Sequence, residues 1–184
     1  MTRLLVTSDN GGPMRWGEPA YLRLGSREIA RAEIVRLDEE RCLHIEHFRP
    51  LNISAAHAIA VRKLAMLEII WQALSMGNAV RCVSLVLYYQ AQGEDEGIRQ
   101  AADRASFLRS FGVSEIKVLP DFAHSMTGQF IVQGVWERTP KALAMLEERL
   151  GRERDVYAEF IASRSLRRLV RQGLRQAAER LRLP

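Results

Sequence analysis

The sequence has few cysteines and no long hydrophobic run. Two cysteines in 184 residues, Cys42 and Cys82, are too few to indicate a disulfide framework. Together with an N-terminus that does not resemble a secretory signal, they favour a reducing, cytoplasmic location. No stretch of roughly 18 apolar residues occurs, which excludes a simple membrane-spanning helix. With 47% hydrophobic and 27% charged residues, the composition is that of a globular protein and excludes a disordered chain.

An excess of charge is also absent from most of the chain. Residues 1–148 carry 17 basic and 18 acidic side chains, whereas residues 149–184 carry 10 arginines and 4 acids. The formal net charge of +5 therefore comes from the C-terminal segment and not from the body of the protein. This distribution argues against a nucleic-acid-binding surface that covers the whole protein.

The first half of the chain predicts strands followed by a long helix. Alternating polar and apolar residues with a polar turn at 38–41 indicate an antiparallel hairpin. Ser54 is a suitable helix N-cap, and apolar residues then recur at helical spacing until Gly77-Asn78, a typical C-terminal stop. We expect strands at 21–24, 27–37 and 42–48, and a helix at 54–76.

The second half alternates between strands and helices. Val80–Tyr89 is an apolar, β-branched run of the kind found in central strands. We expect strands at 80–89, 114–119 and 128–137, and helices at 98–111, 139–150 and 165–183. This order predicts an α+β fold with a mixed central sheet flanked by helices. Residues 1–150 are expected to form the folded domain, and residues 151–184 a basic helical C-terminal extension.

Three segments resemble parts of a known superfamily. Glu46 and Arg49 form a Glu-x-x-Arg motif at the end of an expected core strand. Residues 64–68 (LAMLE) lie in the expected central helix, and residues 104–113 (RASFLRSFGV) include a helix that ends at a glycine. In their order and spacing these segments resemble GNAT-fold acyltransferases, and within them the acyl-homoserine-lactone (autoinducer) synthases. The resemblance covers roughly residues 27–148.

The resemblance implies a GNAT-like fold and the transfer of an acyl group from acyl-CoA or an acyl carrier protein to an amine. It makes Glu46 the base that takes a proton from the attacking ammonium. Arg49 would orient Glu46 or hold a donor phosphate. The alternative for Glu46 is a structural ion pair with Arg49 or another arginine, and the alternative for Arg49 is a surface arginine at the end of the strand. The resemblance also brings S-adenosylmethionine into consideration as a ligand, because it is the second substrate of the lactone synthases.

The same resemblance places the acyl donor beside the central helix and the strand that follows it. The free N–H groups at the start of that helix would bind the donor phosphates, with nearby cationic side chains adding positive charge. For His57, a solvent-facing side chain is the alternative. The residues that would contact the donor are His57, Ala58, Ala60, Arg62 and Ser84.

The phosphate-binding segment differs from that of ordinary GNAT enzymes. Those enzymes carry Gln/Arg-x-x-Gly-x-Gly/Ala, whereas residues 55–60 read AAHAIA, without the first basic or amide residue and with alanine in place of the middle glycine. A non-catalytic GNAT-like binding or regulatory protein is therefore an alternative to an enzyme.

The strand expected at 42–48 contains one cysteine and two histidines, which are possible metal ligands. Cys42 and His44 lie on one face, but the alternation of a strand sends His47 to the other. His57 and His124 have no spacing that metal ligands use. The sequence therefore predicts no metal site, and Cys82 is expected to be a small core residue.

The arginine-rich tail has several interpretations. In the first interpretation, the tail is a helix that packs on the protein through its apolar stripe and turns its arginines to solvent. The resemblance suggests a second one, a docking face for an acidic acyl carrier protein. The third interpretation is that the tail binds an anionic membrane or nucleic acid, in which case the chain would be an interaction protein.

Overall fold

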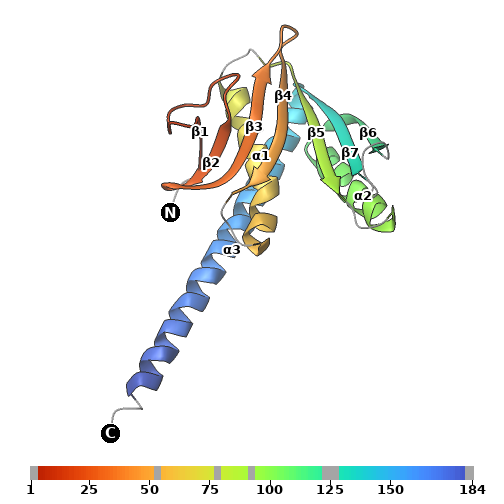
Figure 1. Cartoon of the computed structure of the whole chain (residues 1–184). Helices are drawn as coiled ribbons and strands as arrows, with labels where there is room; N and C mark the ends of the chain where they lie inside the picture. The colour runs from red at the N-terminus through yellow and green to blue at the C-terminus, as the bar shows by residue number, and fades with distance from the viewer. Residues whose placement is uncertain (1–3, 52–54, 77–79, 91–93, 122–128, 181–184) are drawn as a thin grey trace.

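The computed structural model describes residues 4–51, 55–76, 80–90, 94–121 and 129–180. They form an α+β fold in which a mixed sheet is flanked by three helices, as the sequence predicts (Figure 1). The strands are β1 Leu4–Thr7, β2 Ala20–Leu24, β3 Arg27–Leu37, β4 Cys42–Pro50, β5 Cys82–Gln90, β6 Val113–Asp121 and β7 Gln129–Glu137. The helices are α1 Ala55–Ser75, α2 Glu94–Ser110 and α3 Pro140–Arg180.

The seven strands form one sheet in the order β1-β2-β3-β4-β5-β7-β6. The first four strands are antiparallel neighbours, and short turns join β2 to β3 and β3 to β4, as expected for hairpins. Strands β4 and β5 are parallel, because α1 carries the chain back to the other end of the sheet before β5 begins. The helix and this parallel pair therefore form one β-α-β unit at the centre of the fold.

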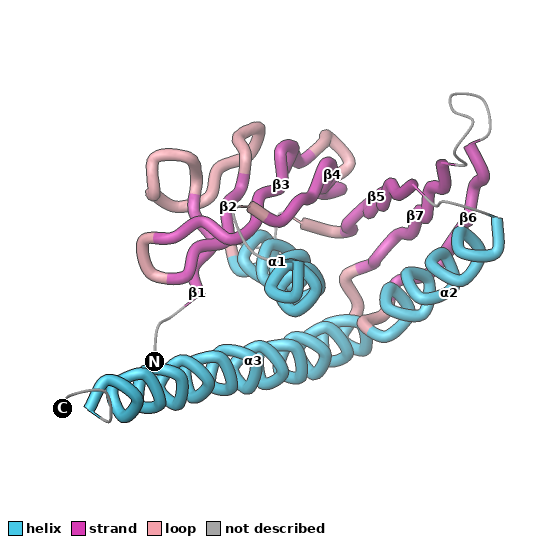
Figure 2. The backbone as a smooth tube through the Cα atoms, turned by 60° about the horizontal axis from the view of Figure 1, so that its bottom comes forward, coloured by secondary structure: helices cyan, strands magenta, loops and turns pink. Residues whose placement is uncertain are grey.

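The helices gather on one side of the sheet (Figure 2). The β4 and β5 residues on that side, Leu43, Ile45, Val83 and Leu85, are all buried. On the opposite side His44 and its register partner Ser84 are half-buried. Helix α1 is buried around most of its circumference between residues 61 and 74, because it lies between the sheet and α3. This explains why its sequence shows little amphipathic contrast.

The three helices meet around Phe107 of α2. The Lys63 ammonium of α1 lies 5.2 Å from the centre of the Phe107 ring, and the Arg149 guanidinium of α3 lies 5.3 Å from it. Behind this contact the Trp136 indole N–H donates a hydrogen bond of 3.0 Å to the Phe111 carbonyl. The buried aromatic side chains thus fix α2 against β7 and against the start of α3.

The C-terminal region differs from the expectation. Two helices at 139–150 and 165–183 were expected, but α3 is a single helix of 41 residues, about 60 Å long. Gly151, the first of its two interior glycines, does not end it. Two ion pairs between residues four apart span this point, Glu148 with Arg152 and Arg149 with Glu153, and support the helix there. The boundary expected after residue 150 falls inside this helix.

Two further elements also differ from the expectation. Helix α2 begins at Glu94, although the acidic segment before Ile98 was expected to be a loop. Acidic residues are favoured in the first turn of a helix, which explains the earlier start. Strand β1, Leu4–Thr7, was not expected, because a four-residue apolar patch is too short to show alternation. Ser54, the expected N-cap, lies outside the described residues.

Among the α3 side chains that the structure describes, those packed against the body extend to Ile161. Tyr157 is 3% exposed, and Phe160 and Ile161 pack against the core as partly buried side chains. Beyond them the helix continues away from the sheet, as Figure 1 shows. No helix in the described part of the chain has the length and hydropathy needed to cross a membrane.

Candidate functional site

The central parallel strands separate from each other part-way along their length. Their register runs from Cys42 opposite Cys82 to Ile45 opposite Leu85, and no pair follows among the described residues. Both strands nevertheless continue for five more residues, β4 to Pro50 and β5 to Gln90. In Figure 1 the two strands diverge below this point and form a V. The inner edges of the V carry backbone groups that no neighbouring strand occupies.

Helix α1 begins at the open end of this V. The last residue of β4 is Pro50 and the first of α1 is Ala55, so the chain turns back at the end where the strands diverge. The first turn of α1 contains no acidic residue. A helix N-terminus carries a partial positive charge, and anions bind there.

Glu46 and Arg49 lie on the diverging part of β4. Glu46 is the first residue after the last β4–β5 pair, and its register partner on the other side is Ile34 of β3. Arg49 follows three residues later and is the register partner of Arg31. Both positions therefore lie on the diverging part of β4.

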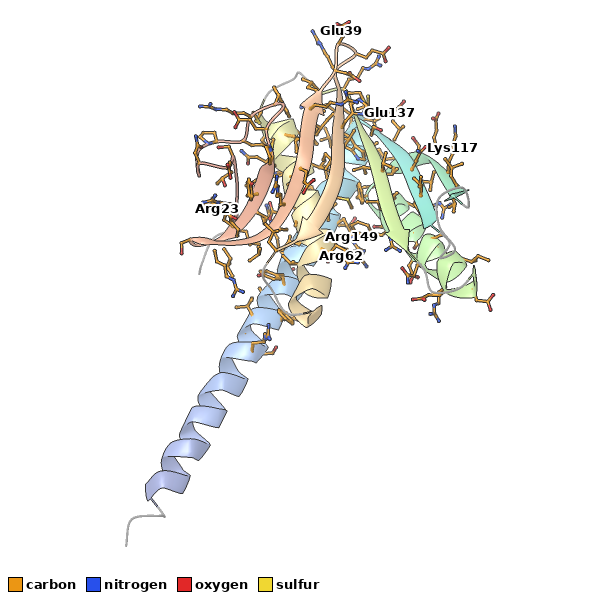
Figure 3. All side chains as sticks on the ribbon, in the orientation of Figure 1. Arg23, Glu39, Arg62, Lys117, Glu137 and Arg149 are labelled. Atoms are coloured by element: carbon orange, nitrogen blue, oxygen red, sulfur yellow. The ribbon has the colours of Figure 1, made fainter. Side chains whose placement is uncertain are left out.

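The expected donor-binding residues separate into two groups. His57, Ala58, Ala60 and Arg62 all lie in the first two turns of α1, at the open end of the V. Arg62 is exposed, and Figure 3 shows it below the strands, whereas Glu39 lies at the top of the view. Ser84 lies apart from them, because it pairs with His44 in the closed part of the V. Ser84 lines a shallow hollow on the helix-free side, together with Lys117, Gln133 and other residues of β5, β6 and β7.

A row of positions across three strands adds a basic residue, Arg31, that sequence spacing does not indicate. Tyr21 of β2 is the register partner of Arg31, which is in turn the partner of Arg49. Two arginines directly opposite each other on neighbouring strands repel, and this arrangement is unfavourable unless an anion or an acidic side chain lies between them. The Arg31 Nε is buried and has no hydrogen-bond partner in the described part of the chain. This row is therefore suited to an anionic ligand group.

Tyr21 anchors this row. Its ring is 6% exposed and lies under two guanidinium groups, that of Arg23 at 5.8 Å and that of Arg31 at 5.5 Å from the ring centre. Arg23 is further held by Glu28, 2.7 Å away, and by a 3.0 Å hydrogen bond to the Asp9 carbonyl. Burial raises the pKa of the Tyr21 hydroxyl, and its hydrogen bond to the Asp9 carboxylate raises it further.

No family model, curated protein or solved structure matches this chain.

The arrangement of these positions permits a specific chemistry. A carboxylic residue follows the point where the strands separate, and positive charge flanks the open end on two sides, from the α1 N-terminus and from the Arg31–Arg49 row. A carboxylate can accept a proton from a nucleophile, and the positive groups can hold phosphate or carboxylate groups of a substrate. Sequence reasoning identified Glu46 and Arg49 from their motif. Arg31 could not be identified in this way, because its significance depends on strand register.

Proposed function

We propose that this protein is a GNAT-like acyltransferase that moves an acyl group from an acyl-CoA or acyl-carrier-protein thioester to an amine. One observation carries the proposal: parallel β4 and β5 separate directly after Ile45 and Leu85, and Glu46 is the next residue. The strand order and the position of α1 at the open end of the V are compatible with the GNAT-like fold that the sequence resembles.

The open V suits an extended ligand with amide groups. Between the diverging strands, backbone N–H and C=O groups face a space that no strand of the described residues fills. A pantetheine chain, which contains two amides, would hydrogen-bond along such an edge as an added strand does. Its phosphate end would lie toward the α1 N-terminus, and the thioester would lie further up the V, toward Glu46.

The proposed reaction needs one base and no covalent intermediate on the protein. Glu46 takes a proton from the ammonium group of the acceptor, either directly or through a water molecule. The neutral nitrogen attacks the thioester carbonyl, the C–N bond forms and the C–S bond breaks. The thiol leaves with a proton, so the products are an amide and a free thiol.

The Arg31–Arg49 row supports a substrate with an anionic group. The donor phosphates are one such group, and an acceptor carboxylate, such as that of S-adenosylmethionine, is another. Both would lie near the β3 side of the V, where the two arginine positions are register partners. Measuring donor and acceptor affinity separately in an Arg31 variant distinguishes the two.

The test is thiol release and amide formation with a panel of donors and amines. The panel contains acetyl-CoA, medium- and long-chain acyl-CoA, the same chains on acyl carrier protein, and S-adenosylmethionine among the acceptors. We expect turnover with one donor class, and Glu46→Gln should lower kcat by roughly 10²–10⁴-fold, with a much smaller change in donor affinity. Glu137→Gln, an exposed glutamate at the far end of β7, is the matched control. Absence of donor binding, or full activity of Glu46→Gln, would overturn the proposal.

The C-terminal extension favours a carrier protein as donor. Residues 165–184 contain six arginines and one glutamate, and α3 extends beyond the body of the protein (Figure 1). Acyl carrier proteins are acidic, and a basic helix would steer their encounter. A chain that ends after Arg164 should bind acyl carrier protein at least ten times more weakly and leave acyl-CoA binding unchanged. Equal carrier-protein affinity of the two chains would contradict this part of the proposal.

A further inference from the structure

The closed end of the V contains a cluster of metal-ligating side chains. Asp38 precedes the tight turn between β3 and β4, and Cys42 and His44 follow it. The His44 Nε2 lies 2.7 Å from the Asp38 Oδ2. Ligand atoms of Asp38, Cys42 and His44 all lie within 4.8 Å of one another. Three different donor types, oxygen, sulfur and nitrogen, therefore converge on one point.

The backbone of the turn fixes these three side chains. The Cys42 N–H donates a 2.8 Å hydrogen bond to Asp38 Oδ1, and the Arg41 N–H donates one of 3.0 Å to the Asp38 carbonyl. Arg41 adopts a positive φ of 62°, which closes the turn and brings Asp38 back over the start of β4. Cys42 and His44 are two residues apart on one strand and so point to the same face.

A second cysteine supports the cluster from the next strand. Cys82 of β5 is the register partner of Cys42, so the two side chains lie beside each other on the same face of the sheet. Residues that orient a ligating side chain from outside the coordination sphere are a regular part of metal sites. All three ligating residues are half-buried, so an ion can reach them from solvent on the helix-free face of the sheet.

We propose that Asp38, Cys42 and His44 form a binding site for a Zn²⁺-type transition metal ion. A thiolate, an imidazole and a carboxylate are ligands that Zn²⁺ uses, and sites with three protein ligands leave one position for water. Tetrahedral bonds of about 2.0–2.3 Å place ligand atoms about 3.3–3.8 Å apart. The ion therefore replaces the short contact between His44 and Asp38 and requires only a small movement of each side chain.

The site has a clear mechanical consequence. It lies at the end of the sheet where β4 and β5 are still paired, whereas the proposed acyl-donor site lies at the open end. A bound ion would hold the β3–β4 turn against β4 and stiffen the closed end of the V. The metal site does not depend on the proposed function, and each can fail without the other.

The experiment titrates the full-length, tag-free, reduced protein with Co²⁺ and follows its absorption. Tetrahedral Co²⁺ bound through a thiolate gives visible d–d bands and a near-ultraviolet thiolate charge-transfer band. We expect saturation at one equivalent, displacement by Zn²⁺, and a rise in melting temperature of several degrees with Zn²⁺. Cys42→Ser should abolish the charge-transfer band, and His44→Gln and Asp38→Asn should each weaken Co²⁺ binding at least tenfold.

The matched control is Glu39→Gln, in the same turn but exposed and outside the cluster (Figure 3). It should bind Co²⁺ as the wild type does. If Cys42→Ser does not fold, His44→Gln and Asp38→Asn still test the site, with circular dichroism of the metal-free proteins as the check on folding. No uptake by the wild type, or uptake that neither His44→Gln nor Asp38→Asn weakens, would overturn the proposal.

Discussion

Glu68 of α1 and Arg154 of α3 are 86 residues apart and form a two-point ion pair that joins the two helices. The Arg154 Nε and Nη2 donate hydrogen bonds of 2.8 and 2.9 Å to the two oxygens of the Glu68 carboxylate. The Glu68 side chain is only 10% exposed, whereas that of Arg154 is 48% exposed. This hydrogen bond raises the pKa of Arg154. The pair fixes the part of α3 that was expected to lie outside the folded domain.

Removing Arg154 should destabilise the protein. Arg154→Met leaves the Glu68 carboxylate buried without a cation, and we expect a loss of about 1–3 kcal/mol of unfolding free energy, less than for a fully buried pair because Arg154 is partly exposed. Arg152→Met is the control, because Arg152 pairs with Glu148 on the surface and should matter by less than about 0.5 kcal/mol. Urea unfolding of both variants measures the difference. Equal stability of the two variants would show that the pair contributes nothing.

Two glycines should respond to alanine in opposite directions. At Gly134 of β7, an added Cβ would lie 2.5 Å from the Val113 Cγ1, closer than real contacts allow. Gly134→Ala should therefore cost about 1–3 kcal/mol. At Gly151 of α3 an added Cβ meets nothing within 4 Å, so Gly151→Ala should stabilise the helix by about 0.5–1 kcal/mol.

Guanidinium unfolding of both alanine variants tests this pair. Val113→Ala in the Gly134→Ala background should restore part of the loss, because it removes the methyl group that clashes. A Gly134→Ala protein as stable as the wild type would mean that β6 shifts away from β7 without cost.

Local patterns in the sequence predict most of the fold, and tertiary contacts explain the exceptions. The run from Val80 to Tyr89 and the uninterrupted apolar spacing of α1 identify the central β-α-β unit. The continuity of α3 through Gly151 could not be predicted in this way, because it depends on ion pairs along the helix and on the contact of Arg154 with Glu68. Single-residue helix breakers are weak signals when packing opposes them.

The residues of the candidate sites could also be predicted only where they lie close together in the sequence. Glu46 and Arg49 were proposed from a motif, because they lie three residues apart in the sequence. Arg31 joins Arg49 only through strand register, and Asp38 joins Cys42 and His44 only through the conformation of a turn. Strand alternation excluded His47 and left only Cys42 and His44 on one face, and their spacing gave no sign that Asp38 joins them. Register and turn geometry are properties that composition and spacing do not contain.

The Tyr21 hydroxyl should titrate later than an ordinary tyrosine. Burial and the hydrogen bond to Asp9 raise its pKa above the usual 10.0. The folded state then holds its proton more tightly than the unfolded state does, so this contribution to stability is fully present below pH 10 and is lost as the pH rises through the folded-state pKa. The difference in tyrosinate absorbance between the wild type and Tyr21→Phe isolates this group. A difference titration centred at or below pH 10 would contradict the prediction.

Arg31 should contribute to the binding of an anionic substrate. If an anion lies between the Arg31 and Arg49 positions, Arg31→Gln should weaken its binding by roughly 10–100-fold, and Arg31→Lys should restore part of the affinity because it returns the charge but not the planar geometry. Isothermal titration calorimetry with donors and acceptors measures the effect. Arg36→Gln, an exposed arginine on the same strand, is the control. An Arg31→Gln protein that binds every ligand as the wild type does would leave the basic row with a structural role only.

The end of the folded body can be located by shortening the chain. Buried contacts of α3 continue to Tyr157, and its partly buried ones to Ile161, so a chain ending after Arg164 should melt within a degree or two of the full-length protein. A chain ending after Leu150 loses both the buried Tyr157 ring and the Arg154–Glu68 pair. Removal of a buried aromatic ring and of the partner of a buried carboxylate should cost more than about 3 kcal/mol of unfolding free energy, which is a large part of the stability of a single domain.

Circular dichroism melting curves of the two shortened chains measure the difference. If the chain ending after Leu150 melts like the full-length protein, the body ends at residue 150 and the contacts of α3 with α1 contribute little.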